Sequence, residues 1–117
     1  MGMTKEAVFK NIRRKDFIVL NVLPDDDFLK LHIRGSQNLP LFQNRGLFAA
    51  EVEKKFGKDK YFITYSADIT CAAGPNAAQA LRNRGFNAQD YPGGMKEWLE
   101  AGLPIEGIQV RQPVPAR

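Results

Sequence analysis

Apolar residues along this chain gather into short runs, and these runs alternate with stretches of helical spacing. Residues 17–22 form an almost wholly apolar run of strand length, typical of a strand buried on both faces of a sheet. Residues 62–65 and 86–91 are also expected to be short strands. Residues 35–40 read as a turn and a short strand that Pro40 stops.

Helices are expected between these runs. Thr4 can cap a first helix, and Phe48, Val52 and Phe56 recur every four residues, as one face of a helix requires. Glycines and prolines mark the ends of the helical stretches. The expected helices cover about residues 5–13, from 25 to near 32, 48–56, 75–84 and 95–101.

Strands that alternate with helices predict an α/β fold with a mostly parallel sheet. In such sheets ligands bind outside the carboxyl ends of the strands. The loop 66–74 leaves the expected strand 62–65 at that end and leads into the expected helix 75–84. This loop is therefore the first place to look for a functional site.

Size and composition exclude several classes of function. With 117 residues, the chain suits one domain over residues 1–108, followed by an extended or disordered tail over 109–117. The net charge of +4 is scattered, without the basic stripe and interleaved aromatics of a nucleic-acid surface. No apolar run reaches the ~20 residues of a membrane span. A lone cysteine fits a reducing compartment, so we expect a cytoplasmic protein with no nucleic-acid or membrane partner.

Cys71 is that single cysteine, and it lies in the loop just before a helix. Loop amides and the positive end of the helix dipole would lower the pKa of a thiol there and make it a nucleophile. A small buried hydrophobe is the alternative, because free cysteines are usually buried. Both interpretations stay open at this point. One histidine, His32, and one cysteine do not predict a metal site.

Two segments resemble the rhodanese-like family. Residues 28–40, FLKLHIRGSQNLP, are similar to the family signature F-x3-HIPGA-x-N-x-P, and residues 91–106, YPGGMKEWLEAGLPIE, are similar to its ending, Y-x-GG-x3-W-x-x-AGLPV. The resemblance implies a central parallel sheet with helices on both faces. It also implies persulfide chemistry with no cofactor: a loop cysteine takes sulfur from a small donor and passes it to a thiol acceptor or an acceptor protein.

The sequence departs from the family pattern in the loop itself. Ser66 occupies the position of the family's nucleophilic cysteine, and Cys71 resembles the second cysteine of a longer-loop subgroup with C-x4-C. A serine hydroxyl without a base nearby is not ionised, so Cys71 is the candidate persulfide thiol. Asp68 would oppose a bound dianion. Asn21 stands where the family has the aspartate of an ion pair.

The resemblance also gives roles to residues around the nucleophile. Some would hold an anion with their loop amides, and others would be structural residues near the loop. The anion-binding residues are Ala67, Asp68, Ile69, Thr70, Ala72, Ala73 and Gly74, and the structural ones are His32, Gly93 and Gly94.

Three functions remain open from the sequence. The first is a rhodanese-like sulfurtransferase domain with a degenerate loop that carries sulfur on Cys71. The second is an inactive rhodanese fold that serves as a binding or regulatory module. The third is phosphate or arsenate chemistry, which would need a cysteine at position 66 and usually a loop arginine, both absent here.

Overall fold

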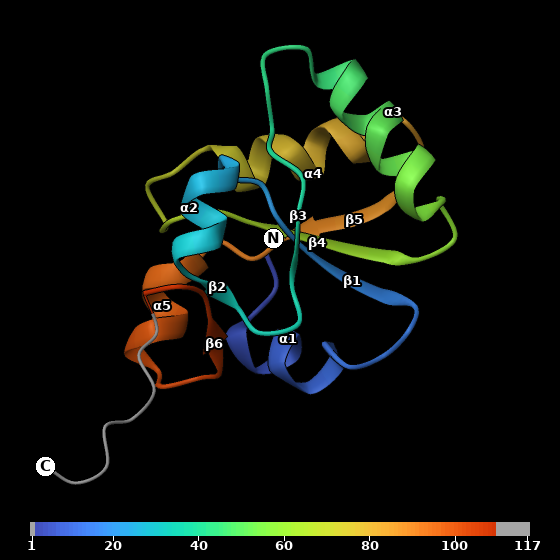
Figure 1. The fold of residues 1–117 in the computed structure, drawn as a ribbon. Helices are drawn as coiled ribbons and strands as arrows, with labels where there is room; N and C mark the ends of the chain where they lie inside the picture. Colours follow the sequence, from blue (N-terminus) through green and yellow to red (C-terminus); the bar gives the residue numbers. More distant parts are fainter. Residues whose placement is uncertain (1, 110–117) are drawn as a thin grey trace, which may run out of the picture.

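A four-stranded parallel sheet forms the centre of the computed structural model, which describes residues 2–109 (Figure 1). Its strand order is β3 (Gln37–Asn38), β1 (Phe17–Asn21), β4 (Tyr61–Tyr65) and β5 (Asn87–Asp90). Asn21 lies opposite Tyr65 in the register, so β1 and β4 end at the same edge. A second, antiparallel pair joins β2 (His32–Ile33) to β6 (Ile105–Glu106).

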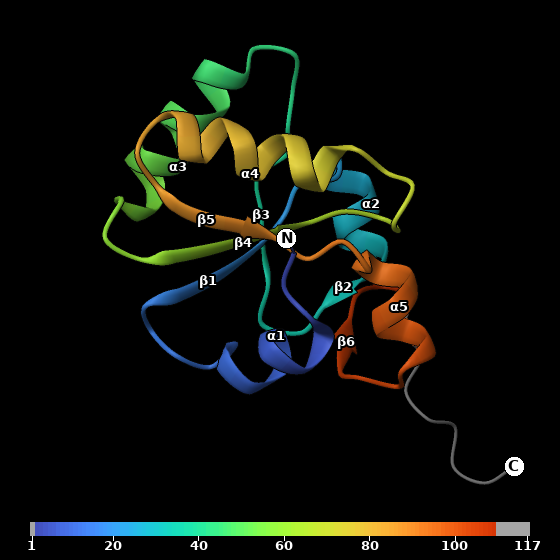
Figure 2. The same cartoon turned by 180° about the vertical axis from the view of Figure 1, so that it is seen from behind.

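Helices cover both faces of this sheet, as Figures 1 and 2 show. On one face lie α3 (Arg45–Phe56) and α4 (Ala73–Asn83). On the other lie α1 (Lys5–Asn11) and α5 (Gly94–Glu100). The short helix α2 (Asp25–Lys30) follows β1. The prediction of a mostly parallel α/β fold flanked by helices is confirmed.

Two apolar clusters hold the layers together, one on each face. The cluster under α3 and α4 contains Leu20, Val22, Phe48, Ala49, Val52, Phe62, Ala77, Ala80, Leu81, Phe86 and Ala88. The cluster under α1 and α5 contains Val8, Phe17, Val19, Ile33, Ile63, Tyr65, Tyr91, Met95 and Trp98. Because β1 and β4 contribute to both clusters, their side chains are buried on both faces, as the nearly unbroken apolar run 17–22 predicted.

The helix bounds differ from the prediction at two N-termini, and α1 and α2 each end about two residues earlier than predicted, at Asn11 and Lys30. Helix α3 begins at Arg45, not near Phe48, because the Asn44 side chain caps it by accepting a hydrogen bond of 3.0 Å from the Leu47 amide. Helix α4 begins at Ala73, because Pro75 falls in its first turn, where a missing N–H costs nothing. The cap at Thr4 is confirmed by a bond of 3.1 Å from the Ala7 amide.

The two strands of the antiparallel pair were not predicted, since two residues each are too few to show an alternating pattern. Beyond β6, the amides of Ile108 and Gln109 donate to the carbonyls of Leu29 and Lys30. The rest of the predicted tail, residues 110–117, lies outside the described residues. Among residues 2–109, no helix is both long and apolar enough to cross a membrane.

Tyr65, the last residue of β4, carries a buried hydroxyl that connects the sheet to the β2–β3 segment. It accepts a hydrogen bond of 3.0 Å from the Ile33 amide and pairs with the Ser36 hydroxyl at 2.8 Å. The side chain is fully buried, so no water replaces these partners if the hydroxyl is removed. These two hydrogen bonds of the Tyr65 hydroxyl fix the end of β4, and they therefore fix the start of the loop 66–74 that follows it.

We therefore predict that Tyr65→Phe lowers the free energy of unfolding by about 1–3 kcal/mol, since it leaves the Ile33 amide buried without an acceptor. The measurement is urea denaturation followed by circular dichroism. Tyr61→Phe is the matched control, because Tyr61 is 45% exposed and begins the same strand. Equal stability of the two variants would contradict a structural role for the Tyr65 hydroxyl.

Candidate functional site

The loop between β4 and α4 is shaped by two polar side chains at its start. The Thr64 hydroxyl donates to the Gly74 carbonyl at 2.7 Å, and the Gly74 amide donates to Ser66 Oγ at 3.2 Å. Ser66 is only 3% exposed. A Cβ at Gly74 would lie 3.4 Å from Ser66 Oγ, at the edge of ordinary van der Waals contact. Ser66 thus ties the beginning of the loop to the first turn of α4.

Helix α5 fixes the other side of the loop. The amides of Met95 and Lys96, which lie in its first turn and lack partners in the helix, donate to the carbonyls of Ser66 and Ala67 at 3.0 and 2.9 Å. Gly94 makes this contact possible: its φ is +63°, and a Cβ there would lie 2.6 Å from the Ser66 carbonyl oxygen. Only glycine fits at this position.

The direction of these carbonyls determines where the loop amides point. In a trans peptide the carbonyl and the next amide point in opposite directions. Because the Ser66 carbonyl faces α5, the Ala67 amide faces the interior of the loop, where it interacts with the Cys71 thiol. The contact with α5 therefore places an N–H donor beside the single cysteine.

Cys71 is partly exposed, and its thiol lies among hydrogen-bond donors. Burial raises the pKa of the thiol, but interactions with the Ser66 hydroxyl and with the amides of Ala73 and Ala67 lower it. The negative charge of Asp68 opposes them. The net result is a pKa below the ordinary value of a cysteine, so the thiolate is more abundant at neutral pH.

The free amides at the N-terminus of α4 lie near Ser66 and Cys71. Ala72 is the N-cap residue and offers no capping side chain. The Gly74 amide donates to Ser66 Oγ at 3.2 Å, and Pro75 has no N–H. Interaction with the Ala73 amide lowers the pKa of the Cys71 thiol. Ser66 thus takes the place of a helix cap, and a thiolate at Cys71 also benefits from the helix dipole.

Asp68 turns back onto its own loop. Its carboxylate oxygen Oδ1 accepts hydrogen bonds from the Thr70 amide at 2.9 Å and from the Thr70 hydroxyl at 2.6 Å. Its carbonyl accepts the Cys71 amide at 3.0 Å. Hydrogen bonds from the Thr70 hydroxyl and amide hold the pKa of Asp68 below its usual value, and nearby Lys96 adds to this effect. Asp68 is therefore ionised at neutral pH.

The other residues predicted for the site lie in the loop, at the start of α5 or in β2. Ile69 is 77% exposed at the loop surface. Gly93 is the N-cap residue of α5 and lies against the Glu97 side chain. His32 lies in β2, where its Nδ1 is 2.8 Å from the Phe28 carbonyl oxygen and its Nε2 is 3.4 Å from a carboxylate oxygen of Glu106. Within residues 2–109, no group of three or more metal-binding side chains comes together.

A cavity of about 280 Å³ opens beside the loop, and we call it the loop-side pocket. It is lined by Asp68, Ile69, Thr70, Gly93, Lys96, Glu97 and Glu100. The three α5 side chains in this set were not predicted from the sequence. A signal was present in the family-like ending at residues 91–106, which implies that the start of α5 lies against the loop.

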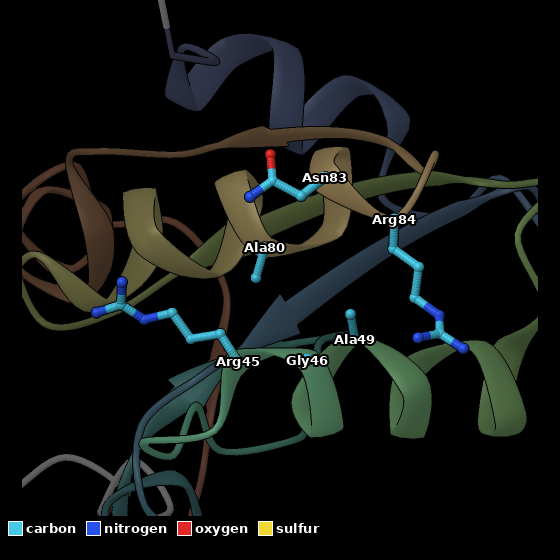
Figure 3. Close-up of a pocket in the computed structure, with 6 residues that line it drawn as sticks. All are labelled: Arg45, Gly46, Ala49, Ala80, Asn83 and Arg84. Atoms are coloured by element: carbon cyan, nitrogen blue, oxygen red, sulfur yellow. The ribbon is translucent and has the colours of Figure 1, made fainter.

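A hollow of about 270 Å³ lies between α3 and α4, away from the loop (Figure 3). Ala49 and Ala80 face each other across it, while Arg45 and Arg84 lie at opposite ends. Arg84 is paired with Glu53 at 2.8 Å. None of the residues that line this hollow belongs to the loop 66–74, so it adds no group to the Cys71 site.

Similar proteins were found at the level of sequence and of structure. The family model of the rhodanese-like domain matches residues 4–101. A curated relative, the HTH-type transcriptional regulator Rv0324 of Mycobacterium tuberculosis, is 23% identical over 105 residues. The match covers 90% of this chain but only 44% of that protein, so the chain spans less than half of the relative.

Among solved structures, the BH2092 protein of Bacillus halodurans matches with a TM-score of 0.80 at 20% identity, over 92% of this chain and 77% of that one. The rhodanese-like domain of the Anabaena protein Alr3790 matches with a TM-score of 0.77 at 22% identity, over 99% of this chain and 86% of that one. At these identities the likeness concerns the fold. Together with the family model, it shows that the chain belongs to the rhodanese-like domain family.

Proposed function

We propose that this domain carries sulfane sulfur on Cys71, as a persulfide sulfurtransferase whose nucleophile is five residues after the position that the family resemblance would give it. The observation that carries the proposal is the surroundings of the thiol. Cys71 is partly exposed, and the Ser66 hydroxyl and the amides of Ala67 and Ala73 lower its pKa. A reactive thiolate needs this combination of access and stabilised negative charge.

The same hydrogen-bond donors around Cys71 act at each step of the reaction. The Cys71 thiolate attacks the outer sulfur of a donor, the donor's bond to that sulfur breaks, and the rest of the donor leaves with the electron pair. With thiosulfate the leaving group is sulfite, and with an alkyl persulfide it is a thiolate. An acceptor thiolate then attacks the outer sulfur on Cys71 and regenerates the free thiolate. The amides of Ala67 and Ala73 stabilise the anion before and after each transfer.

Ser66 has a supporting role in this proposal. Its oxygen already accepts the Gly74 amide, which leaves the hydroxyl proton free to be donated to the Cys71 sulfur. A hydroxyl cannot itself form a persulfide. It can stabilise the neighbouring thiolate and shape the loop, and this explains why a serine is compatible with the position.

A second candidate function is a binding or regulatory module without turnover. The burial of Ser66 favours it, because the residue at the family's nucleophile position is 3% exposed and engaged in a structural hydrogen bond. This candidate predicts that neither thiosulfate nor any persulfide adds sulfur to the protein.

Sulfur loading decides between the two. We expect Cys71, incubated with thiosulfate or with a freshly prepared alkyl persulfide, to gain one sulfur atom from at least one donor, as measured by intact mass and peptide mapping. Cys71→Ala should gain none. If no donor loads the protein while an alkylating agent still reaches Cys71, the sulfur-carrier proposal fails and the binding module remains.

The role of Ser66 is tested by the titration of Cys71. We expect Ser66→Ala to move the midpoint of the pH profile of Cys71 alkylation upward by about one pH unit, the size of one charge-assisted hydrogen bond. The sign follows from the loss of a donor that favours the thiolate. Thr4→Ala is the control, since it removes a hydroxyl that accepts the Ala7 amide at the start of α1 instead. An unchanged midpoint in Ser66→Ala would show that the hydroxyl does not act on the thiol.

A further inference from the structure

The loop-side pocket is lined by three residues of the loop that carries Cys71, although Cys71 itself is not among its lining residues. Asp68 belongs to the same tight turn as Cys71, because its carbonyl accepts the Cys71 amide at 3.0 Å. Its carboxylate is also fixed, since Oδ1 accepts both the amide and the hydroxyl of Thr70. A negative charge is therefore held in place three residues before the nucleophile.

We propose that Asp68 determines the donor specificity of the Cys71 site: it disfavours dianionic donors such as thiosulfate and favours alkyl persulfides that carry an ammonium group near their sulfur. This inference rests on the proposed function of Cys71 as a sulfur carrier. It goes further because it names the class of donor and the residue that selects it.

The hydrogen bonds of Asp68 also reduce what the loop can offer to an anion. A loop that cradles a dianion does so with free amides. Here the amides of Thr70 and Cys71 both donate to Asp68. The Gly74 amide donates to Ser66 Oγ at 3.2 Å. Three loop amides that could hold the sulfonate end of thiosulfate, those of Thr70, Cys71 and Gly74, are thus already engaged within the loop.

The remaining charges of the pocket act in the same direction. Glu97 and Glu100 line the pocket together with Asp68, against a single lining cation, Lys96. Glu97 Oε1 accepts the Tyr91 hydroxyl at 2.8 Å, and its Oε2 is 3.8 Å from Lys5 Nζ. Within residues 2–109, Glu100 has no ion-pair partner. The lining residues therefore carry a net negative charge that attracts an ammonium group and repels a dianion.

Transfer from such a donor needs no further reactant. The Cys71 thiolate attacks the outer sulfur of R–S–SH and forms a new sulfur–sulfur bond, while the original sulfur–sulfur bond of the donor breaks. The products are Cys71–S–SH and R–S⁻, so one negative charge and one proton appear on each side. The ammonium group of the donor stays unchanged and serves only to place the donor against Asp68.

The first test measures charge preference at Cys71 without any sulfur transfer. Methanethiosulfonates of equal length with an ammonium or a sulfonate end react with the thiol, and the ratio of their two rates cancels the thiolate fraction. We expect the ammonium reagent to react about tenfold faster at low salt and Asp68→Asn to reduce this preference several-fold, because the variant removes the negative charge that acts on the Cys71 thiol. High salt should reduce the preference of the wild-type protein.

Asp68→Asn keeps an oxygen that can accept the Thr70 hydrogen bonds, so the loop should keep its shape. Asp59→Asn is the matched control, because Asp59 is in the turn before β4, at the opposite end of that strand from the loop. It should leave the ratio of rates unchanged. Asp68→Glu restores the charge and should restore most of the preference.

The second test uses sulfur donors on the wild-type protein and on Asp68→Asn, with loading followed by intact mass. The donors are thiosulfate, a free ammonium-bearing alkyl persulfide and a lysine-containing peptide with a cysteine persulfide. We expect the wild-type protein to load faster from at least one ammonium-bearing donor than from thiosulfate. Of the two ammonium-bearing donors, the one that loads the protein faster shows whether the source is a small molecule or a peptide. Asp68→Asn should gain about tenfold in thiosulfate loading relative to persulfide loading.

The outcomes separate this inference from the proposed function. Loading of the wild-type protein that is equally fast from all donors and unaltered by Asp68→Asn would overturn the role of Asp68 and leave the sulfur carrier intact. No loading from any donor would end the sulfur-carrier proposal, and the methanethiosulfonate ratios would still report whether Asp68 sets the charge preference of the thiol.

Discussion

The backbone contact between the loop and helix α5 is the constraint on which the site depends. The carbonyls of Ser66 and Ala67 accept the first amides of α5, and Gly94 has the positive φ and the missing Cβ that bring the two segments together. This contact satisfies a helix N-terminus and, because peptide groups are planar, turns the Ala67 amide toward Cys71. One pair of hydrogen bonds thus supports both the fold and the chemistry of the thiol.

The sheet and most helices could be predicted because their signals are local. The run 17–22 is apolar on both faces, and Phe48, Val52 and Phe56 repeat with the period of a helix. The β2–β6 pair could not be predicted, since His32–Ile33 and Ile105–Glu106 join segments far apart in the chain and are too short to show a pattern. The early start of α3 depends on an Asn44 side-chain bond, which propensity alone does not specify.

The candidate site was predictable in its location but not in its internal geometry. The position of Cys71 before a helix indicated that loop amides would surround the thiol, and Ser66 stood out because serine replaced a cysteine in a recognisable pattern. The sequence could not show that Asp68 bonds to Thr70, or that Lys96, Glu97 and Glu100 line a pocket beside the loop. The pocket arises from the packing of α5 against the loop, which is a tertiary contact, whereas the Asp68–Thr70 bond is local to the loop.

The chain has a single cysteine, and this limits how a sulfur atom placed on it could be released. Two-cysteine sites can expel such an atom by closing an internal disulfide, because a second, resolving thiol attacks the first. Here the Ser66 hydroxyl, which interacts with the Cys71 thiol, cannot play that part. Under the proposed function, the thiol that discharges Cys71 must therefore come from outside these 117 residues, and the rate of each cycle would depend on the approach of that thiol rather than on motion within the domain.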